Sequence, residues 1–306
     1  MITVENLTKK FREVTAVEGL TFQVKEGEVF GFLGPNGAGK TTTIRILCCL
    51  ISKTSGEAKI DDYQIGQAAD SLGIRKMIGL VPDNVGLYDD LSAFENLDFY
   101  GKLYECPEGL RRENIERFLK MLGLCERKDT RAGSFSKGMK QKLALARALV
   151  HEPKILFMDE PTANLDPESA KTVRDFILEV KKQGRTIFLS THNLDEAQRV
   201  CDRIGIIKTK LLTIGSPEQL RESLTKPKTE IKLAQVSEAF LTELRKLIPN
   251  KIEVSGNKLI IDVTDPDKDN PTIIAAIASA GGLIQEVTHL VPTLEDVYLQ
   301  IVKETE

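Results

Sequence analysis

The sequence predicts an α/β fold in which a large domain built on a parallel-rich sheet precedes a small α+β domain. Short apolar runs at 154–161 and 185–193 each follow a helical segment, which is typical of a buried parallel sheet. From about residue 226 the pattern changes to strand, helix, strand, strand, helix, strand, the order of ferredoxin-like domains. A chain of 306 residues has room for about two such domains.

The elements of the large domain follow from the spacing of apolar residues. Alternation of apolar and polar residues predicts strands, and apolar residues three or four positions apart predict helices. We expect strands at 2–11, 19–34 and 74–83, a helix at 41–51, helices between 92 and 124, and a basic helix within 134–149.

The small domain follows the same reasoning, with its boundary near residue 222. We therefore expect domains of 1–222 and 223–306. Within the second, the predicted strands are 229–235, 251–256, 258–265 and 283–291, and the predicted helices are 237–248, 270–282 and 293–304.

The composition excludes several classes of protein. A net charge of −3 gives no general attraction to nucleic acid. No apolar run approaches the roughly 18–20 residues that span a bilayer, and the N-terminus lacks the apolar stretch of a signal peptide. The five cysteines lack the spacing of a disulfide framework, and the adjacent Cys48 and Cys49 fit packing in an apolar helix. We therefore expect a reduced, cytosolic protein that does not bind nucleic acid.

The strongest motif is GPNGAGKTT, which fits the P-loop pattern G-x-x-x-x-G-K-[ST]. It follows an apolar strand and opens a helix, the context that a P-loop requires; the alternative is a plain glycine-rich turn. Its glycines let successive backbone N–H groups face a phosphate. Lys40 offers a cation to the outer phosphates, and Thr41 offers a hydroxyl to Mg²⁺. The predicted phosphate-binding residues are Gly34, Pro35, Asn36, Gly37, Ala38, Gly39, Lys40, Thr41 and Thr42.

Two further apolar strands end in polar residues, where ligands bind in open α/β sheets. Asp159 is placed to hold Mg²⁺ through water, and Glu160 to accept a proton from a water that attacks a γ-phosphate. The alternative is that both acids simply meet solvent. His192 ends the next strand and can reach the same crevice, whereas we interpret His151 and His289 as structural.

The basic helix begins unusually, with Ser136 and Gly138 at its entrance. The backbone N–H groups in the first turn of a helix have no partners within that helix. The sequence therefore predicts that this helix end faces a negatively charged group.

Together these motifs resemble the nucleotide-binding subunit of an ABC transporter, over residues 1 to about 220. The family's LSGGQ motif stands here as FSKGM, residues 135–139. The resemblance implies a P-loop ABC-type ATPase domain with a mixed sheet and a helical subdomain at about 85–150. It also implies that the chain binds ATP and Mg²⁺ and hydrolyses ATP to ADP and phosphate, with Glu160 and His192 as catalytic residues.

The resemblance further implies a head-to-tail dimer with two ATP molecules at its interface. In such a dimer Ser136 and Gly138 bind the γ-phosphate of ATP held on the P-loop of a second copy. Asn164, Leu165 and Asp166 resemble the D-loop, which links the two sites.

Four residues are compared with the family pattern, because one matches it in only one of two interpretations and three differ from it. Phe11 matches the aromatic residue that stacks on adenine, although it equally fits a core position. Lys137 adds positive charge near the partner's phosphate, and Met139 cannot replace the hydrogen bond of the family's glutamine. Asp83 stands in place of the Q-loop glutamine, where a carboxylate can ligate Mg²⁺ but cannot donate a hydrogen bond to water.

The C-terminal segment PTLEDVYLQIV resembles the accessory domain of drug- and lipid-exporter ATPases of the daunorubicin-resistance type. This resemblance implies an exporter subunit at the cytoplasmic face of the cell membrane, docked through its Q-loop side on a separate membrane permease. The alternatives are a soluble ABC-family ATPase and a nucleotide-dependent switch that does not hydrolyse ATP. The sequence does not identify the transported substrate.

Overall fold

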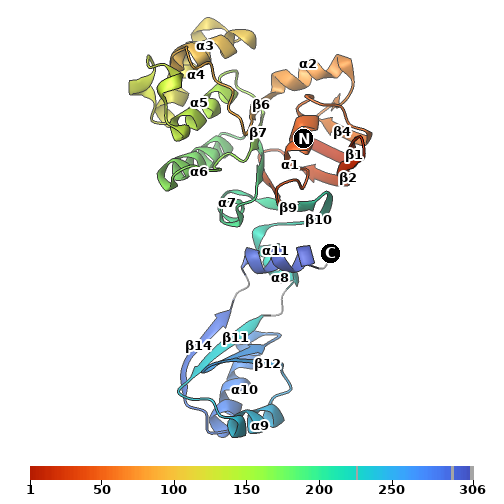
Figure 1. Ribbon diagram of the computed structural model, residues 1–306, viewed down its shortest axis with the longest axis vertical. Coiled ribbons are helices and arrows are strands. Elements are labelled where there is room, and N and C mark those ends of the chain that lie inside the picture. Colours follow the sequence, from red (N-terminus) through yellow and green to blue (C-terminus); the bar gives the residue numbers. More distant parts are fainter. Residues whose placement is uncertain (225–226, 291–292, 304–306) are drawn as a thin grey trace. The chain divides into compact units, whose positions relative to one another are not determined.

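The computed structural model describes residues 1–224, 227–290 and 293–303, and the chain divides into two compact units, Met1–Pro217 and Glu218–Glu306 (Figure 1). Each unit has a hydrophobic core of its own. The predicted boundary near residue 222 falls inside helix α8 (Pro217–Leu224).

The first unit contains two sheets. A six-stranded sheet has the order β10-β9-β3-β8-β7-β6, and it is parallel except for β10, which runs antiparallel to β9. A four-stranded antiparallel sheet has the order β2-β1-β4-β5. The strands are β1 (Ile2–Phe11), β2 (Val14–Val24), β3 (Val29–Leu33), β4 (Ser55–Ile60), β5 (Tyr63–Gln64), β6 (Ile78–Val81), β7 (Ile155–Asp159), β8 (Thr186–Thr191), β9 (Arg203–Lys208) and β10 (Lys210–Gly215).

The core of this unit lies between the two sheets and includes helix α1 (Lys40–Leu47). Ring centroids of Phe22, Phe32 and Phe188 lie 5.4 to 6.1 Å apart and join strands of both sheets. Because β3 and β8 are buried along their whole length, their carboxyl ends are held rigidly side by side. Those ends carry the P-loop and His192.

Helices α3 (Ala93–Leu103), α4 (Glu108–Met121) and α5 (Lys137–Leu149) lie together beyond β6 and β7, away from the antiparallel sheet (Figure 1). They fall within the region predicted to be a helical subdomain. Ser92 and Glu95 form a reciprocal capping box that fixes the start of α3. Helices α6 (Pro167–Lys182) and α7 (Leu194–Val200) follow β7 and β8.

Two predicted elements differ from the structure. Only Ile78–Val81 of the predicted strand 74–83 is a strand, because helix α2 (Ala68–Met77) extends through the residues before it. Acidic Asp70 in its first turn and basic residues in its last turn complement the helix dipole. The predicted helix 41–51 ends at Leu47, since Cys49 adopts φ +55° and closes a Schellman motif. Cys48 is buried as expected, while Cys49 is half-buried outside the helix.

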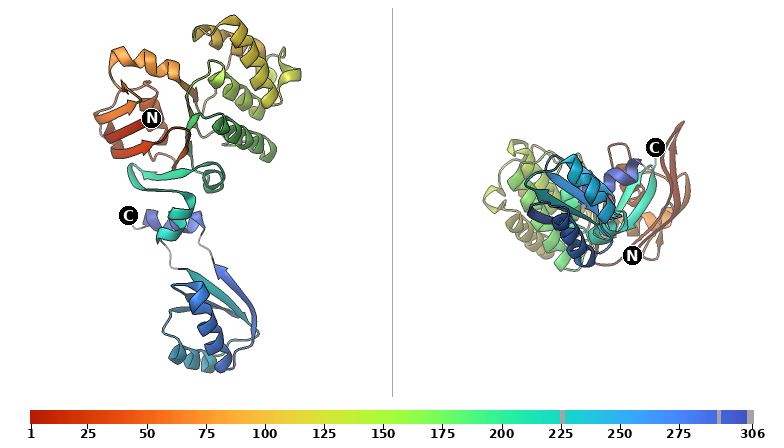
Figure 2. Two further views of the ribbon diagram at one scale, coloured as in Figure 1. Left: turned by 180° about the vertical axis from the view of Figure 1, so that it is seen from behind. Right: turned by 90° about the horizontal axis from the view of Figure 1, so that it is seen from below.

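The second unit confirms the predicted order of elements. Its antiparallel sheet has the order β12-β13-β11-β14, which is that of ferredoxin-like domains, and α9 and α10 pack on one of its faces (Figure 2). Helix α10 begins four positions before the predicted helix at 270, because Asp265 caps it and Pro266 occupies its first turn. The elements are β11 (Lys228–Leu233), α9 (Glu238–Leu247), β12 (Ile252–Ser255), β13 (Lys258–Asp262), α10 (Pro266–Ser279), β14 (Ile284–Leu290) and α11 (Leu294–Lys303).

The ends of two predicted elements, residues 291 and 304, lie outside the described residues. In the part of the chain that the structure describes, no helix has both the length and the apolar character that a membrane crossing needs.

Candidate nucleotide site

The P-loop connects β3 to α1 and bounds a pocket of about 200 Å³. Gly39 must be glycine, because its φ is +100° and a Cβ would lie 2.5 Å from the carbonyl oxygen of Ala16. The structure brings eight of the nine predicted P-loop residues to this pocket, together with two predicted acids. The lining residues are Pro35, Asn36, Gly37, Ala38, Gly39, Lys40, Thr41, Thr42, Asp83 and Glu160.

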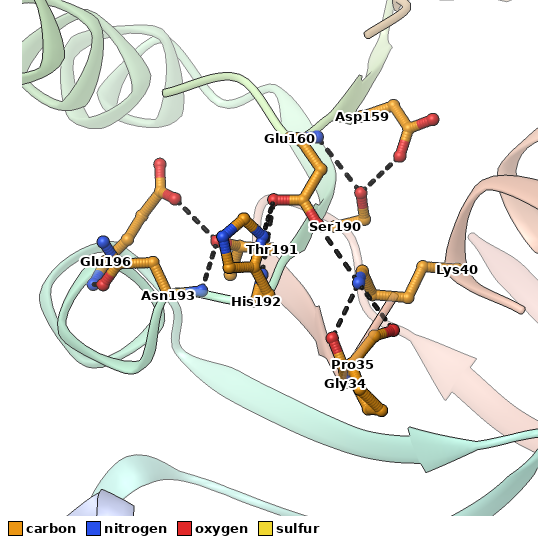
Figure 3. Close-up of polar contacts among 10 residues, drawn as sticks. All are labelled: Gly34, Pro35, Lys40, Asp159, Glu160, Ser190, Thr191, His192, Asn193 and Glu196. Atoms are coloured by element: carbon orange, nitrogen blue, oxygen red, sulfur yellow. Dashed lines mark hydrogen bonds and ion pairs between the residues drawn. The ribbon is translucent and has the colours of Figure 1, made fainter. Parts of the chain in front are cut away.

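Lys40 is buried, and its ammonium contacts polar groups of its own chain (Figure 3). Its ammonium donates to the carbonyl oxygens of Gly34 at 2.7 Å and Pro35 at 3.1 Å. It also lies 3.1 Å from Glu160 Oε1. This arrangement holds a cation at the place where the outer phosphates of a nucleotide are expected, with a carboxylate as its present counterion.

The end of β7 sends its two acids in different directions. Asp159 is buried, and its Oδ1 accepts a 2.5 Å hydrogen bond from the Ser190 hydroxyl on β8. Glu160 has φ +51°, which turns the chain sharply out of the strand. Its N–H donates to Ser190 Oγ at 3.1 Å, so one serine fixes both acids. Glu160 can therefore face the P-loop while Asp159 stays at the sheet edge.

His192 follows β8 and contacts Glu160 directly (Figure 3). Its Nδ1 lies 2.8 Å from Glu160 Oε2, and its backbone N–H donates to the same oxygen at 3.3 Å. The imidazole is 55% exposed, so it can also reach a ligand from solvent. The predicted pair of Glu160 and His192 is therefore brought together by the structure.

The predicted Mg²⁺ ligands are Thr41, Asp159 and Asp83. Thr41 and Asp83 line the P-loop pocket, and Asp159 lies at the adjoining strand end. Within the described residues no three His, Cys, Asp or Glu side chains gather as a metal site. Mg²⁺ usually takes only one or two carboxylates and completes its shell with phosphate oxygens and water. A hydroxyl and carboxylates beside a phosphate site fit that preference.

Ser136 and Gly138 lie at the start of α5, as predicted, and are not among the residues that line the P-loop pocket of their own chain. The Ser136 hydroxyl accepts from the backbone N–H of Met139 at 3.3 Å, and Lys137 is exposed. A Cβ on Gly138 would lie 2.3 Å from the Ser169 hydroxyl of α6. Glycine here allows the two helix ends to approach closely.

The predicted D-loop joins β7 to α6. Asn164 is exposed with φ +56°, and Leu165 is half-buried. Asp166 caps α6 by accepting from the Ser169 N–H at 2.8 Å, and this hydrogen bond lowers the pKa of its carboxyl. The loop thus leads from Glu160 to the helix end that touches Gly138.

Three other side chains considered in the sequence analysis, those of Phe11, His151 and His289, have different surroundings in the structure. Phe11 ends β1, is 46% exposed and lies beneath the Lys9 ammonium, so the core alternative for it is wrong. His151 stacks on Tyr104 with ring centroids 3.8 Å apart, and burial lowers the pKa of its imidazole, as suits a structural histidine. His289 is exposed on β14.

The sequence interpretation missed two polar residues of the site, Ser190 and Glu196. Ser190 ends an apolar strand and carries no motif of its own. Glu196 had a usable signal: Asn193 followed three positions later by a glutamate is the spacing of a helix start with a capping box.

Comparison with known proteins identifies the family. The chain matches the ABC transporter family over residues 17–163 and the C-terminal domain of DrrA1-3-like ATP-binding proteins over residues 215–302. Linearmycin resistance ATP-binding protein LnrL of Bacillus subtilis (strain 168) is 36% identical over 267 residues, which cover 86% of this chain and 85% of LnrL. Nod factor export ATP-binding protein I of Rhizobium sp. (strain N33) is 34% identical over 98% of this chain and 96% of its own.

Solved structures of ATP-binding cassettes are also similar to this chain. The dimeric ATP-binding cassette MJ0796, in a post-hydrolysis state bound to ADP and Pi, superposes with a TM-score of 0.64 at 28% identity, over 71% of this chain and 98% of its own. The predicted ABC-type fold, the ATPase activity and the resemblance to drug-resistance ATP-binding proteins are thus confirmed. The chain belongs to the ABC transporter family, as one of its ATP-hydrolysing ATP-binding subunits.

Proposed function

We propose that this chain powers a separate integral membrane subunit, that it acts as a homodimer closed by two Mg·ATP, and that the complex exports drug-like or lipid-like substrates. The observation that carries the proposal is the division of the site. Lys40 and Glu160 line one pocket and His192 contacts Glu160, whereas Ser136 and Gly138 present a helix start that does not line this pocket. A second copy, turned head to tail, supplies what the pocket lacks.

The geometry supports in-line attack of water on the γ-phosphate. The P-loop N–H groups and Lys40 hold the phosphates, and Glu160 takes the proton of the attacking water as the bond from the γ-phosphorus to ADP breaks. His192 orients Glu160 through the 2.8 Å contact. Thr41, Asp159 and Asp83 would hold Mg²⁺, which neutralises charge on the phosphate oxygens. Because Lys40 now pairs with Glu160, the incoming γ-phosphate must displace that carboxylate.

The membrane partner is expected on the helical region beside Asp83. There Tyr88 and Phe99 are 48% and 43% exposed, and their ring centroids lie 5.1 Å apart. Buried Arg147 packs against the neighbouring Tyr100 ring at 5.0 Å. Exposed aromatic residues are typical of the centre of a protein interface. This surface follows Asp83 directly, so docking there can reach the P-loop pocket.

Export and location rest on the relatives. LnrL is named for linearmycin resistance, and its match extends beyond the ATPase domain of this chain. The Nod factor relatives are named for export. By analogy we place this chain at the cytoplasmic face of the cell membrane, held there by its permease and without nucleic acid as a partner.

The dimer can be tested by the mass of the full chain in solution. With Mg·ATP, Glu160→Gln should shift from 34.0 kDa to twice that mass in light scattering, because the dimer forms but cannot hydrolyse its ATP. Adding Ser136→Glu should keep the protein monomeric, since a carboxylate would face the partner's γ-phosphate. Ser134→Glu, an exposed serine two positions earlier, is the matched control and should still dimerise.

Turnover and reconstitution distinguish the alternatives. If wild type and Glu160→Gln bind ATP with equal, negligible hydrolysis, the chain is a switch. If the wild type hydrolyses ATP but its rate does not respond to the membrane subunit encoded beside it, in lipid vesicles, the soluble ATPase is correct. Export requires ATP-dependent movement of a substrate across the vesicle membrane, away from the face that carries this chain.

A further inference from the structure

A buried carboxyl supports the segment that carries His192. Glu196, on the first turn of α7, is 2% exposed, and its Oε2 accepts a 2.8 Å hydrogen bond from the Thr191 hydroxyl, which is equally buried (Figure 3). Thr191 Oγ1 in turn accepts from the Asn193 N–H at 3.0 Å. The Asn193 side chain accepts from the Glu196 N–H at 3.1 Å.

These three hydrogen bonds form a closed ring around the backbone of His192. Thr191 and Asn193 are its immediate neighbours, and Glu196 ties both of them to α7. The His192 side chain is 55% exposed, so contacts with neighbouring side chains cover less than half of it. Its 2.8 Å contact with Glu160 therefore depends on the orientation that the ring gives to the backbone.

The ring exceeds what a helix start needs. In an ordinary capping box the glutamate reaches back to the backbone N–H of the cap residue. Here that N–H belongs to Asn193 and donates to Thr191 Oγ1, and the Glu196 carboxyl binds the inserted hydroxyl instead. An exposed capping box costs nothing in desolvation, whereas the Glu196 carboxyl must be desolvated because it is buried. Such a cost is typical of a position under functional demand.

We propose that Glu196 is a positioning residue for ATP hydrolysis, which through Thr191 holds His192 in line with Glu160. This inference rests on the proposed roles of Glu160 and His192. It assigns Glu196 no contact with ATP, so the P-loop should bind nucleotide normally without it.

The test measures steady-state ATP hydrolysis by the full chain. Glu196→Leu removes the acceptor at similar volume and should lower kcat between about tenfold and a hundredfold with little change in KM for ATP, because misplacing a catalytic group slows chemistry more than binding. Glu196→Gln keeps an acceptor oxygen and should retain most of the wild-type kcat. Asp195→Leu, at the neighbouring exposed acid, is the control and should match wild type.

A second comparison separates positioning from general structural support. In a His192→Ala background, Glu196→Leu should cause no further loss of kcat, because it acts through His192. Should Glu196→Leu not yield folded protein, Thr191→Val against Thr191→Ser makes the same comparison, since only valine lacks the hydroxyl.

The inference is overturned if Glu196→Gln is as slow as Glu196→Leu, or if the losses from Glu196→Leu and His192→Ala multiply. A wild-type rate for Glu196→Leu also overturns it, while the roles of Glu160 and His192 stand. A wild-type rate for His192→Ala overturns the site assignment and the inference together.

Discussion

Asp83 stands where the resemblance to the family implies a Q-loop glutamine, and its position gives this difference a chemical meaning. The carboxylate is exposed and lines the P-loop pocket with Thr41 and Glu160. A glutamine there would present a neutral amide, whereas aspartate adds an anionic oxygen ligand of the kind that Mg²⁺ prefers. The site should therefore use Asp83 to hold the metal.

Replacing Asp83 by asparagine should raise the Mg²⁺ concentration needed for half-maximal ATP hydrolysis several-fold. The reason is the loss of a charged ligand at nearly constant shape. Titrating Mg²⁺ at saturating ATP measures the effect. Asp90→Asn, at an exposed acid that does not line the pocket, is the matched control. Identical Mg²⁺ curves for both variants would remove Asp83 from the metal site.

The pKa of Glu196 makes stability depend on pH. Burial raises the pKa of this carboxyl, Glu160 adds to the rise, and the Thr162 and Thr191 hydroxyls and Arg174 oppose it. Between the unfolded pKa and the raised folded pKa, the folded chain binds more protons, so the free energy of unfolding falls as pH rises. Because the glutamine of Glu196→Gln does not titrate, this variant should not lose that part of its free energy of unfolding as the pH rises.

The free energy of unfolding of Glu196→Gln, relative to that of wild type, should therefore increase from about pH 4 upward. It should become constant above the raised pKa of Glu196 in the folded wild type. Urea unfolding at several pH values measures this difference. A difference that is the same at every pH would show that Glu196 is not protonated more readily in the folded chain.

At this scale the sequence predicts the residues that a motif fixes. Lys40, Glu160 and His192 were identified because phosphate binding and proton transfer require those residue types at strand ends. Ser190 could not be identified in this way, because its role arises from Asp159 and Glu160 on a distant segment, which the sequence does not place beside it. The spacing from Asn193 to Glu196 predicts a helix start but not the hydrogen bond to Thr191.

At the scale of elements, the predicted helices and strands are mostly present and the errors lie at their ends. Cys49 in the left-handed conformation ends α1 early, and no glycine marks that point in the sequence. Helix α2 overrides the strand pattern at 74–77 because charges at its ends complement its dipole. Apolar spacing predicts the type of an element, while its ends depend on single backbone angles and caps.

The approach of α5 to α6 depends on one glycine, and this leads to a prediction. Gly138→Ala places a methyl group 2.3 Å from the Ser169 hydroxyl, so the two helix ends must separate. We expect a loss of about 1–3 kcal/mol in the free energy of unfolding, as for other overpacked sites. ATP hydrolysis should fall as well, because Ser136 shares that helix start. Urea unfolding and phosphate release measure the two effects.

Gly109→Ala in α4 is the matched control, because no atom within 4 Å meets its added Cβ. It should be as stable as wild type or slightly more so, since alanine favours a helix. Equal behaviour of the two alanine variants would mean that α5 and α6 do not need this close contact.

At the scale of the whole molecule, the two units are built on separate hydrophobic cores. One lies between the two sheets and α1, and the other lies between the ferredoxin-like sheet and helices α9 and α10. The order of elements in the second unit was predictable because each apolar run is short and bounded by turn residues. The catalytic motifs all belong to the first unit, so the energetics of the second core can be changed without touching them.

Leu244 offers a direct test of that independence. It is fully buried in the second core, and Leu244→Ala should cost this unit about 2–5 kcal/mol by leaving a cavity. In calorimetry we expect two unfolding transitions, of which only one moves to lower temperature, while ATP hydrolysis by the full chain is unchanged. Leu247→Ala on the same helix, at a position 52% exposed, should move neither. A single transition that shifts as a whole, together with loss of ATP hydrolysis, would mean that the second core supports the catalytic unit and that the chain unfolds as one cooperative structure.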